Sequence, residues 1–385
     1  MWFDLSPGIK NYNWGTPGVL SKFLGLQDSS LLEAEAWFGR HPQSETIIHD
    51  GEKSLSFLDW LEAKDSSFDL LLKLLSASRP LSIQVHPNES EAQRGYLLEQ
   101  SRGSMTESQE ITFTDPRPKP ELIVALSPDF RALYGFVSWE RLVARLEALV
   151  QHGALPSFAL DVTRQSAQLR DFLEWVLLNG QSVSEATGVL AEAIDSGTLM
   201  PNATELGINT DTLERVHRGH PGDSGLLLTL AMHHLSLKEG EGLFVAPGTA
   251  HAYVKGFGLE VMVPSDNVVR AGLTTKPKHP EAFLEMTRLD AFHEPDIVLP
   301  EKLGDVFLYA CSGMPFELRR LGGQPAREIL ARDSLIVVES GHITVGAGHR
   351  KTLVRSGGVG FAEAFDVVIA GDQSTRAWLA TNLME

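Results

Sequence analysis

The sequence predicts a mainly β protein of more than one domain, with a block of helices inserted between its strand-rich parts. Its 385 residues exceed what one hydrophobic core usually organises. Short apolar runs and apolar–polar alternations, separated by Gly and Pro, fill residues 1–137 and 223–385, as strands do. Residues 138–222 instead carry apolar side chains at helical spacing. We therefore expect an interrupted β domain (1–137 and 223–292), a helical insert (138–222) and a C-terminal β domain (293–385).

Composition limits the partners of this protein. Hydrophobic residues make up 43% and charged residues 22% of the chain, as in ordinary globular proteins. A formal net charge of −17 argues against nucleic acid or an anionic membrane as a partner, but does not exclude a small anionic substrate. The lone Cys311 excludes an intramolecular disulfide and suits a reducing compartment. With no signal-peptide pattern and no membrane-length apolar run, we expect a cytoplasmic protein, and a monomer.

The first strand-rich part contains one pattern that bears on chemistry. Residues 34–41 are a strand candidate, and the apolar run 69–75 suits a buried helix. Residues 79–90 alternate apolar and polar side chains, which predicts a strand that ends at a proline. Gln84 and His86 then point to the same side, about 7 Å apart at the base, because side chains alternate along a strand. A metal ion could lie between them.

The next segment brings further charged groups to an extended chain. Residues 89–96 suit a short helix, and 102–114 suit a polar loop. Alternate prolines keep residues 115–121 out of a helix, so Lys119 and Glu121 are expected on one side of an extended segment. It leads into an apolar run, 122–126, that predicts a buried strand.

Four helices are predicted in the insert. Ser138 is the expected N-cap of the first, and each apolar-periodic segment ends at a glycine, as helices often do. The segments span 138–153, 167–180, 184–197 and 210–219. Strands are expected to resume with the apolar run 226–237.

The stretch from 243 to 276 holds more ionisable groups than loops of this length need for packing. A short strand, 242–245, and a turn precede two alternating segments, 251–254 and 258–263. On such strands the side chains of His251, Tyr253 and Glu260 could share one face of a sheet and line a cavity. The stretch therefore predicts a site, formed from His251, Tyr253, Glu260, Asp266, Asn267, Arg270 and Lys276. After it, 278–290 suits a loop and a short helix, and the C-terminal part suits a small β barrel or sandwich.

Gln84, His86, Glu121 and His251 are the candidate metal ligands. Three separate extended segments each present polar groups among apolar residues, and such N and O donors fit a borderline divalent ion such as zinc, with positions left for water or substrate. A lone histidine on a strand is more often structural than a metal ligand, so a structural role for these residues stays open at this point. Thiolate ligation is excluded by the single cysteine.

The remaining candidates each have a structural alternative. Arg270, Lys276 and Lys119 could bind a phosphate or a developing oxyanion, or could be solvated loop charges. Glu260 and Asp266 are candidate general bases, or caps and ion-pair partners. Trp14 and Trp37 could line the pocket, although core packing is the commoner use of an indole. The other histidines stand alone in sequence, His41 and His279 among them. Walker, GxGxxG and GxSxG motifs are absent from the sequence.

Six stretches carry a family resemblance. They are NYNWG (11–15), AEAWFGRHP (34–42), PLSIQVHPNE (80–89), KPEL (119–122), PGDSG (221–225) and GTAHAYVKGFGLEVMVPSDNVVRAGLTTK (248–276). In these stretches and in their order the sequence resembles the type I phosphomannose isomerases of bacteria. The resemblance runs from the first residues to about Lys276, and the C-terminal part is similar only in general character.

The resemblance implies a fold and a set of site residues. The fold is a cupin barrel interrupted by a helical domain and followed by a second cupin-like barrel. One zinc ion would be held by the four candidate ligands above. The pocket would use Lys119, Tyr253, Glu260, Asp266 and Arg270 in catalysis, and Ser82 and Lys276 in substrate binding, to which we add Trp14. Two positions depart from the family pattern: Pro118, where histidine is usual, and Glu89, where lysine is common.

The implied reaction is the interconversion of mannose 6-phosphate and fructose 6-phosphate through a cis-enediol, with either Glu260 or Asp266 as the base. Two alternatives remain open at this point. The pocket could isomerise another phosphorylated or free aldose, or the chain could be a non-catalytic cupin that binds a sugar phosphate. No feature of the sequence points to a cupin oxygenase.

Overall fold

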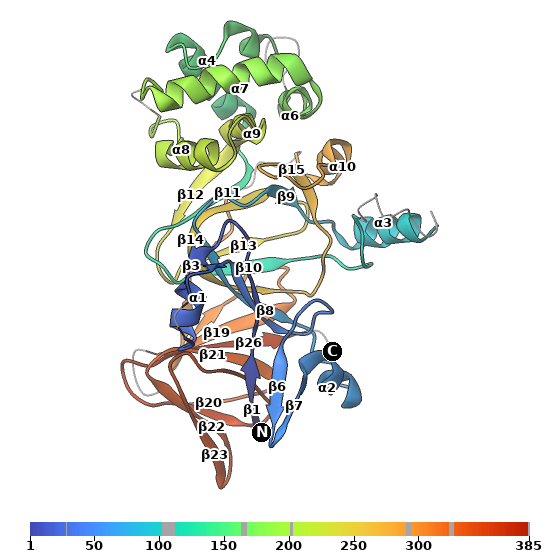
Figure 1. Cartoon of the computed structure of the whole chain (residues 1–385), viewed down its shortest axis with the longest axis vertical. Helices are drawn as coiled ribbons and strands as arrows, with labels where there is room; N and C mark the ends of the chain where they lie inside the picture. Colours follow the sequence, from blue (N-terminus) through green and yellow to red (C-terminus); the bar gives the residue numbers. More distant parts are fainter. Residues whose placement is uncertain are drawn as a thin grey trace.

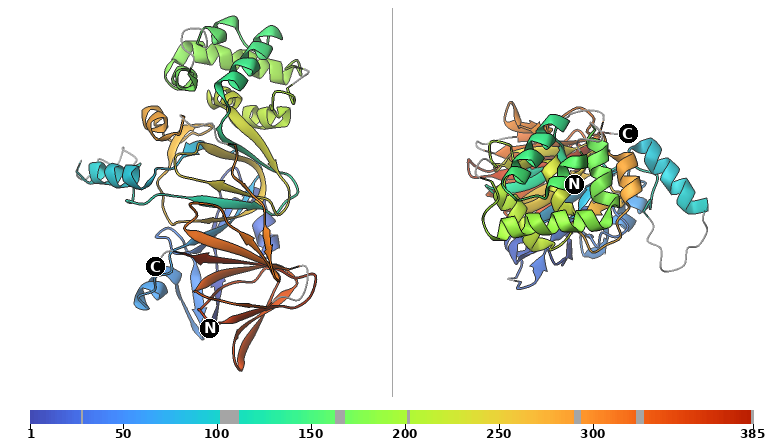
Figure 2. Two further views of the ribbon diagram at one scale, coloured as in Figure 1. Left: turned by 180° about the vertical axis from the view of Figure 1, so that it is seen from behind. Right: turned by 90° about the horizontal axis from the view of Figure 1, so that it is seen from above.

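The computed structural model describes residues 1–27, 29–101, 112–162, 168–200, 203–289, 294–322 and 327–383. Figure 1 shows an elongated molecule in three tiers, with helices at one end and strands in the middle and at the other end. From behind and from above, helix α3 (Glu89–Ser101) projects sideways from the middle tier (Figure 2). The polar loop predicted over 102–114 lies mostly outside the described residues, as does the domain boundary predicted at 292/293.

The middle tier is an eleven-stranded sheet organised around the long strand β14 (His251–Met262). The first half of β14 pairs with β11 (Phe130–Phe136) and β9 (Ile83–Val85), and the second half pairs with β8 (Leu71–Ala77) and β10 (Glu121–Ala125). Between the halves Gly256 has a φ of 128°, and a Cβ there would lie 2.7 Å from the Phe130 ring. Glycine therefore permits the change of partners.

The other strands of this sheet extend it on both sides of β14. They are β2 (Gly8–Lys10), β5 (Glu35–Gly39), β12 (Met232–Leu237), β13 (Gly242–Val245), β15 (Val269–Gly272) and β16 (Ile297–Val298). Two predicted strands, 251–254 and 258–263, are thus one continuous strand, and the remaining strand predictions around the site are confirmed.

The tier farthest from the helices combines the C-terminal strands with strands from the beginning of the chain. Its nine-stranded sheet runs in the order β17 (Glu301–Leu303), β18 (Val306–Tyr309), β19 (Phe316–Gly322), β26 (Arg376–Asn382), β21 (Ser334–Ser340), β24 (Val359–Ala362), β1 (Trp2–Ser6), β6 (Ile47–Asp50) and β7 (Lys53–Ser56). A four-stranded sheet follows the order β20 (Arg327–Ile329), β25 (Val367–Ala370), β22 (His342–Ala347) and β23 (Arg350–Arg355). Three N-terminal strands therefore belong to the sheet of the last part of the chain.

Short elements complete the first hundred residues. Two strands pair with each other, β3 (Thr16–Pro17) and β4 (Leu32–Glu33), and two helices are short, α1 (Val19–Phe23) and α2 (Phe57–Ala63). A further short helix, α10 (Pro280–Met286), follows the predicted site stretch. Strands outnumber helices among the described residues, which confirms the mainly β class.

The helical tier is an excursion between two neighbouring strands, because β11 and β12 pair with each other and all of its helices lie between them in sequence. Ser138 caps the first helix by accepting a hydrogen bond from the Arg141 amide, as predicted. The buried Arg145 guanidinium donates to the carbonyls of Leu230 and Met232, tying this tier to the start of β12. The elements are α4 (Trp139–Gln151), η1 (Ser157–Leu160), α6 (Leu169–Leu178), α7 (Gly180–Asp195), α8 (Thr210–Gly219) and α9 (Gly225–Ala231).

Two secondary-structure predictions are wrong. The run 69–75, predicted as a helix, forms most of strand β8, whose residues are all buried between β5 and β14. The run 226–237, predicted as a strand, is helix α9 followed by strand β12. In both cases a short and mostly apolar run has no clear periodicity, so a buried strand and a buried helix look alike in sequence.

Two apolar cores hold the tiers together. The outer face of β9 contributes Ile83 and Val85 to the core beneath the helices, so Gln84 between them faces the opposite side. A second core joins the middle tier to the lower tier, with Phe38, Leu72, Leu122, Phe316, Leu335 and Trp378 among its members. Among the described helices, none is long and apolar enough to cross a membrane.

Candidate active site and metal centre

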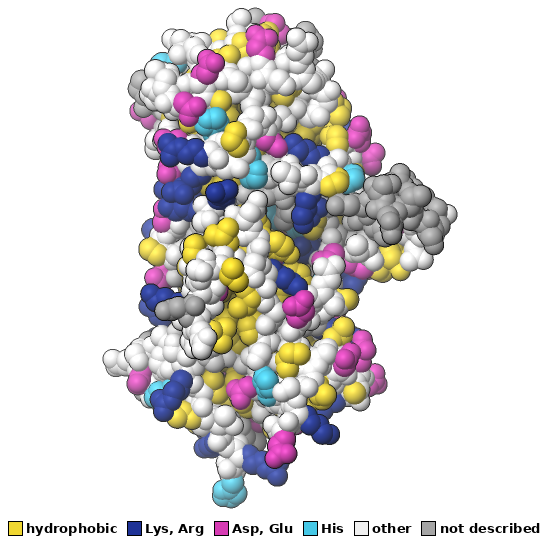
Figure 3. All heavy atoms as spheres, in the orientation of Figure 1, with side chains coloured by type: hydrophobic (Ala, Val, Ile, Leu, Met, Phe, Trp, Pro, Cys, Tyr) yellow, Lys and Arg dark blue, Asp and Glu magenta, His cyan; other side chains and the backbone are white. Residues whose placement is uncertain are grey.

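A cavity of about 790 Å³ opens in the middle tier and contains most of the predicted site residues. Figure 3 shows a hollow below the helical tier with Lys and Arg side chains around it. Eleven predicted residues line the cavity: Trp14, Trp37, Ser82, Gln84, Lys119, Glu121, Tyr253, Glu260, Asp266, Arg270 and Lys276. His86 and His251 form a buried cluster with Glu121. Asn267 does not line the cavity, and its buried amide donates to the carbonyls of Asp115 and Arg117.

His86, Glu121 and His251 are arranged as metal ligands. One ligand atom from each lies within 4.8 Å of the others, and all three side chains are buried. The Nε2 of His86 is 3.4 Å from Glu121 Oε1, and the Nε2 of His251 is 3.5 Å from Glu121 Oε2. Three separate strands or strand ends thus bring two imidazoles to the two oxygens of one carboxylate.

The second nitrogen of each imidazole shows why this cluster suits a cation. His86 Nδ1 lies 2.8 Å from the carbonyl of Asn267, and His251 Nδ1 lies 3.1 Å from the carbonyl of Thr249. A carbonyl only accepts, so each Nδ1 carries the ring proton and each Nε2 turns a lone pair toward Glu121. His86 Nε2 is buried without a hydrogen-bond partner. Burial also lowers the pKa of His86 to about 4, which keeps its ring neutral. Lone pairs facing a carboxylate repel it unless a cation lies between them.

Gln84 adds a fourth polar group beside these lone pairs. It is the register partner of His251 across β9 and β14, and its amide lies 3.3 Å from His251 Nε2. Ser82 donates from Oγ to the other end of the amide, Oε1, at 3.2 Å. A half-turn of the amide would point its carbonyl oxygen at the cluster. The set of two imidazoles, a carboxylate and an amide is therefore complete.

Lys119 keeps the ligand carboxylate ionised. Its Nζ lies 3.0 Å from Glu121 Oε1, and both side chains are buried. Burial alone would raise the pKa of Glu121, but the charge of the Lys119 ammonium outweighs burial and holds that pKa well below its usual value. Metal binding requires the ionised form, so the carboxylate is ready for a cation.

A second charged cluster lies on the neighbouring strands. Lys73 is the register partner of Glu260, and its Nζ lies 3.6 Å from Glu260 and 3.4 Å from Glu35. Glu35 also accepts from the Trp37 indole at 3.1 Å, and the Lys73 ammonium lies 4.6 Å from the Trp37 ring centroid. The ammonium is thus held between two carboxylates and an aromatic ring.

Glu260 has the pKa of a group that titrates near neutrality. Burial raises its pKa, the charges of Glu121 and Glu35 raise it further, and Lys73 opposes them, with a result of about 7. The Tyr253 hydroxyl is also buried in the pocket. Burial, followed by the charges of Glu260 and Glu121, raises the pKa of Tyr253 well above its usual value, so the phenol keeps its proton.

Asp266 lies in a different environment, at the pocket rim. Its Oδ1 lies 3.3 Å from His41 Nε2. Burial raises the pKa of Asp266, but the contact with His41 and the charges of Lys119 and Lys73 lower it below the usual value. The prediction that His41 stands alone is therefore wrong. The two residues are 225 positions apart, and only the fold brings them together.

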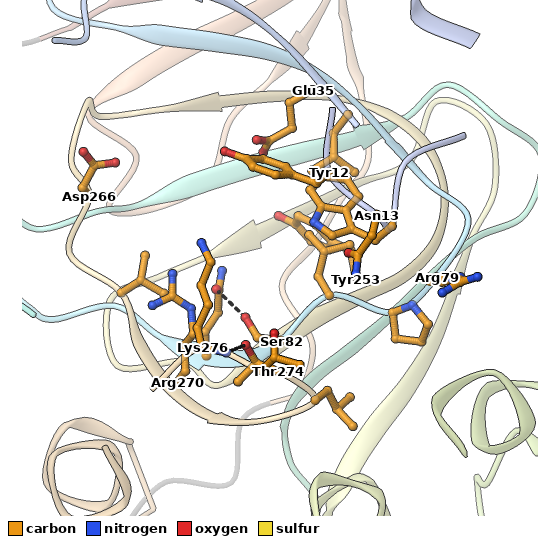
Figure 4. Close-up of a pocket in the computed structure, with 18 of the residues that line it drawn as sticks. Tyr12, Asn13, Glu35, Arg79, Ser82, Tyr253, Asp266, Arg270, Thr274 and Lys276 are labelled. Atoms are coloured by element: carbon orange, nitrogen blue, oxygen red, sulfur yellow. Dashed lines mark hydrogen bonds between the residues drawn. The ribbon is translucent and has the colours of Figure 1, made fainter. Parts of the chain in front are cut away.

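The cationic side of the pocket lies opposite the N-terminal segment. Arg270 is the register partner of Gln84 across β15 and β9, so both side chains point to the same face. In the view of Figure 4, Arg270, Lys276 and Ser82 lie across the pocket from Glu35 and Tyr12. Arg79, Thr274 and His279 also line the cavity, and Asn13 lies beside Tyr12 in Figure 4.

Sequence reasoning missed Lys73, Glu35 and His41 as site residues. One signal was available for Lys73, a single charge within an apolar run, because a lysine is seldom buried without a partner. The two departures from the family pattern do not reach the cavity. Glu89 is exposed at the first position of α3, where Gln93 donates to it, and neither Glu89 nor Pro118 lines the pocket.

Comparison with known proteins agrees with this geometry. A family model described as "Phosphomannose isomerase type I, catalytic domain" matches residues 2–138. The mannose-6-phosphate isomerase of Escherichia coli (strain K12) is 34% identical over 284 residues, which cover 70% of each chain. The human mannose-6-phosphate isomerase is 30% identical over 307 residues, covering 71% of this chain and 70% of that one.

Solved structures resemble the whole chain. A crystal structure of a phosphomannose isomerase variant from Salmonella typhimurium has a TM-score of 0.86 and 26% identity, with 100% of both chains covered. A mannose 6-phosphate isomerase bound with zinc and yttrium has a TM-score of 0.85, also at 26% identity and with 100% of both chains covered.

A mainly β fold, a buried two-histidine, one-carboxylate cluster and a polar pocket beside it define a metal-dependent enzyme. The relatives that match more than two thirds of the chain specify the family of enzyme. The chain belongs to the type I phosphomannose isomerase family.

Proposed function

We propose that this protein is a zinc-dependent aldose–ketose isomerase that interconverts mannose 6-phosphate and fructose 6-phosphate through a cis-enediol. One observation carries the proposal. Two buried imidazoles turn their Nε2 lone pairs toward Glu121, beside a pocket whose floor holds a carboxylate with a pKa of about 7. The names of the relatives supply isomerisation and mannose 6-phosphate, and fructose 6-phosphate is the corresponding 2-ketose.

The metal would be held by Gln84, His86, Glu121 and His251. Support comes from the zinc-bound relative and from the donor set itself, which zinc accepts. When bound, zinc supplies a Lewis acid that polarises the sugar oxygens near C1 and C2. The carbonyls of Asn267 and Thr249 hold the two imidazoles in the required tautomer.

Glu260 is the proposed proton carrier. The open-chain aldose loses its C2 proton to the Glu260 carboxylate while its C1 oxygen gains a proton, which gives the cis-enediol. Glu260 then returns its proton to C1 while the C2 hydroxyl loses its proton and becomes the ketone, so that a second proton moves overall from the C2 oxygen to the C1 oxygen. The same group must accept and then return a proton, which is fastest when its pKa lies near the working pH. Burial favours a raised pKa at Glu260, whereas the contact with His41 and the nearby lysines lower the pKa of Asp266 in spite of its burial. We assign Asp266 to hydrogen bonding with a sugar hydroxyl.

Cations around the pocket would stabilise the negative charge that develops on the enediol oxygens. Lys73 and Lys119 are buried beside Glu260 and Glu121, and Arg270 faces the same side as Gln84. Fixed donors in a site shielded from water are effective at this task. Lys276 and Ser82, which also line the cavity, are proposed to bind the substrate phosphate and hydroxyls, with Tyr253 and Trp14 closing the wall.

We also propose that the strands form two cupin barrels. The nine- and eleven-stranded sheets and the match to phosphomannose isomerase structures over the whole chain support this. The divisions at 137/138, 222/223 and 292/293 stay predictions. Strands β1, β6 and β7 pair within the nine-stranded sheet, so we assign these N-terminal strands to the C-terminal domain. The monomeric state and the cytoplasmic location also stay predictions.

The test is turnover of mannose 6-phosphate to fructose 6-phosphate by the protein as isolated, after chelation and after zinc is restored. We expect activity to disappear with the metal and return with zinc. Undiminished turnover by metal-free protein would refute the metal role. Tight binding of mannose 6-phosphate without turnover, in fully metallated protein, would favour the non-catalytic alternative. Turnover of a different phosphoaldose alone would favour the other isomerase.

A further inference from the structure

We propose that His41 is a positioning residue for the isomerase: its Nε2–H holds the Asp266 carboxylate in the orientation that contacts the sugar. The inference deepens the proposed function and rests on it for the role of Asp266. His41 itself does not line the cavity, so it would act only through Asp266.

The ring of His41 is held in a single orientation. Only 2% of its surface is exposed, and its Nδ1 lies 3.1 Å from the backbone nitrogen of Gln43. A backbone N–H can only donate, so Nδ1 accepts and the ring proton is on Nε2. The Trp37 ring packs edge-on against the imidazole, with centroids 5.0 Å apart and planes at 87°. The ring cannot turn without losing both contacts.

The protonated Nε2 then lies 3.3 Å from Asp266 Oδ1. This is the tautomer opposite to that of the two metal-cluster histidines, whose Nδ1 atoms carry the proton. His41 is therefore built as a donor toward Asp266, and the lowered pKa of Asp266 agrees with a donor at this place.

The backbone of Asp266 is held separately. Its N–H donates to Asp115 Oδ2 at 3.3 Å, and Asp115 also accepts from Ser265 Oγ and from Asn267 Nδ2. Asp115 thus positions the turn, while His41 positions the carboxylate at the end of the side chain. With 32% of that side chain exposed, the carboxylate would have freedom to rotate if the contact with His41 were lost.

The experiment compares His41→Leu with His41→Gln in the zinc-loaded enzyme. Leucine removes the donor, whereas the glutamine amide can place an N–H near the position of Nε2. We expect kcat to fall about 10- to 100-fold in His41→Leu, with little change in KM, and to recover most of that loss in His41→Gln. Unchanged kcat in His41→Leu, or an equal loss in both variants, would overturn the proposal.

A double variant separates an effect through Asp266 from a general disturbance. In the Asp266→Asn background, His41→Leu should reduce kcat no further, because the carboxylate it positions is gone. Losses that multiply would overturn the proposal. His234 offers a matched control: its Nδ1 accepts from the Asn209 amide at 3.1 Å and its Nε2 lies 2.9 Å from the Thr229 carbonyl, away from the pocket lining. His234→Leu should leave kcat unchanged.

One measurement does not depend on the folding of His41→Leu. Nitrogen NMR of the zinc-loaded wild-type enzyme should find the His41 proton on Nε2, with a resonance that moves in Asp266→Asn. A proton on Nδ1, or a resonance indifferent to Asp266→Asn, would overturn the proposal. If the wild-type enzyme lacked isomerase activity, the proposed function would fail while the ring measurement still decided whether His41 donates to Asp266.

Discussion

The floor and the rim of the pocket hold two carboxylates in opposite environments. Glu260 lies on the sheet, its side chain 3% exposed among other carboxylates, and its pKa rises to about 7. Asp266 lies on the turn after that strand, 32% exposed and beside an imidazole donor, and its pKa is lowered. The difference teaches that six residues of separation in sequence can give one carboxylate a proton-carrying role and the other a binding role.

Removing a metal ligand should have the largest effect, because neither carboxylate is expected to support turnover without the metal. His251→Ala removes one ligand and leaves the two oxygens of Glu121 with a single imidazole. We expect loss of bound zinc and of measurable turnover, because each residue that binds the metal directly contributes to metal affinity. Metal content and activity should be measured on the same folded sample. A variant that retained full zinc would remove His251 from the ligand set.

Replacing the floor carboxylate should cost more than replacing the rim carboxylate. Glu260→Gln should lower kcat about 100- to 10,000-fold, the usual contribution of a general base. Asp266→Asn should lower it about 10- to 100-fold, as loss of a positioning contact does. Both variants should keep their zinc. The reverse order, with Asp266→Asn the more damaged, would exchange the two roles.

The cation facing the enediol should affect the chemical step more than binding. Arg270→Ala should lower kcat about 100- to 1,000-fold with zinc retained, because transition-state charge loses a fixed donor. Steady-state kinetics separates the alternatives. A rise in KM at constant kcat would reassign Arg270 to uniform substrate binding.

The pH profile of the enzyme should report the pKa of Glu260, the carboxylate on the floor of the pocket. Glu35 raises the pKa of Glu260 by its charge, so Glu35→Gln should lower that pKa. Glu260 must be deprotonated to accept the C2 proton, and a lower pKa therefore keeps the enzyme active at lower pH. We expect the acid limb of kcat/KM to move down by roughly one pH unit relative to wild type. If the acid limb stayed in place or moved to higher pH, a group other than Glu260 would be responsible for it.

The smallest effect is expected at a departure from the family pattern. Glu89 is exposed at the first position of α3 and does not line the cavity. Glu89→Lys should therefore leave kcat and KM within about twofold of wild type, since an exposed charge beyond the pocket is screened by salt. A marked fall in KM would indicate that this position reaches the substrate phosphate.

Much of the site could be predicted because its residues lie in patterned segments. Alternation in the strand around Gln84 placed that side chain away from the apolar core, and the structure agrees. The site residues that the family resemblance implies all come to one pocket or to the buried cluster beside it. Lys73 was lost with the strand that carries it, because an apolar run without periodicity was assigned to a helix.

From the sequence alone follow most of the kinds of element, the insertion of helices into a β protein, the candidate donors for a metal and the family to which these residues belong. Those properties are local: alternation, helical spacing, caps and motifs are written within a few tens of residues. Only the tertiary structure decided which carboxylate is buried among like charges and which meets His41. It also decided that β1, β6 and β7 join the last sheet. Such outcomes depend on contacts between residues far apart in sequence, because burial and neighbouring charge set a pKa and long-range pairing sets a sheet.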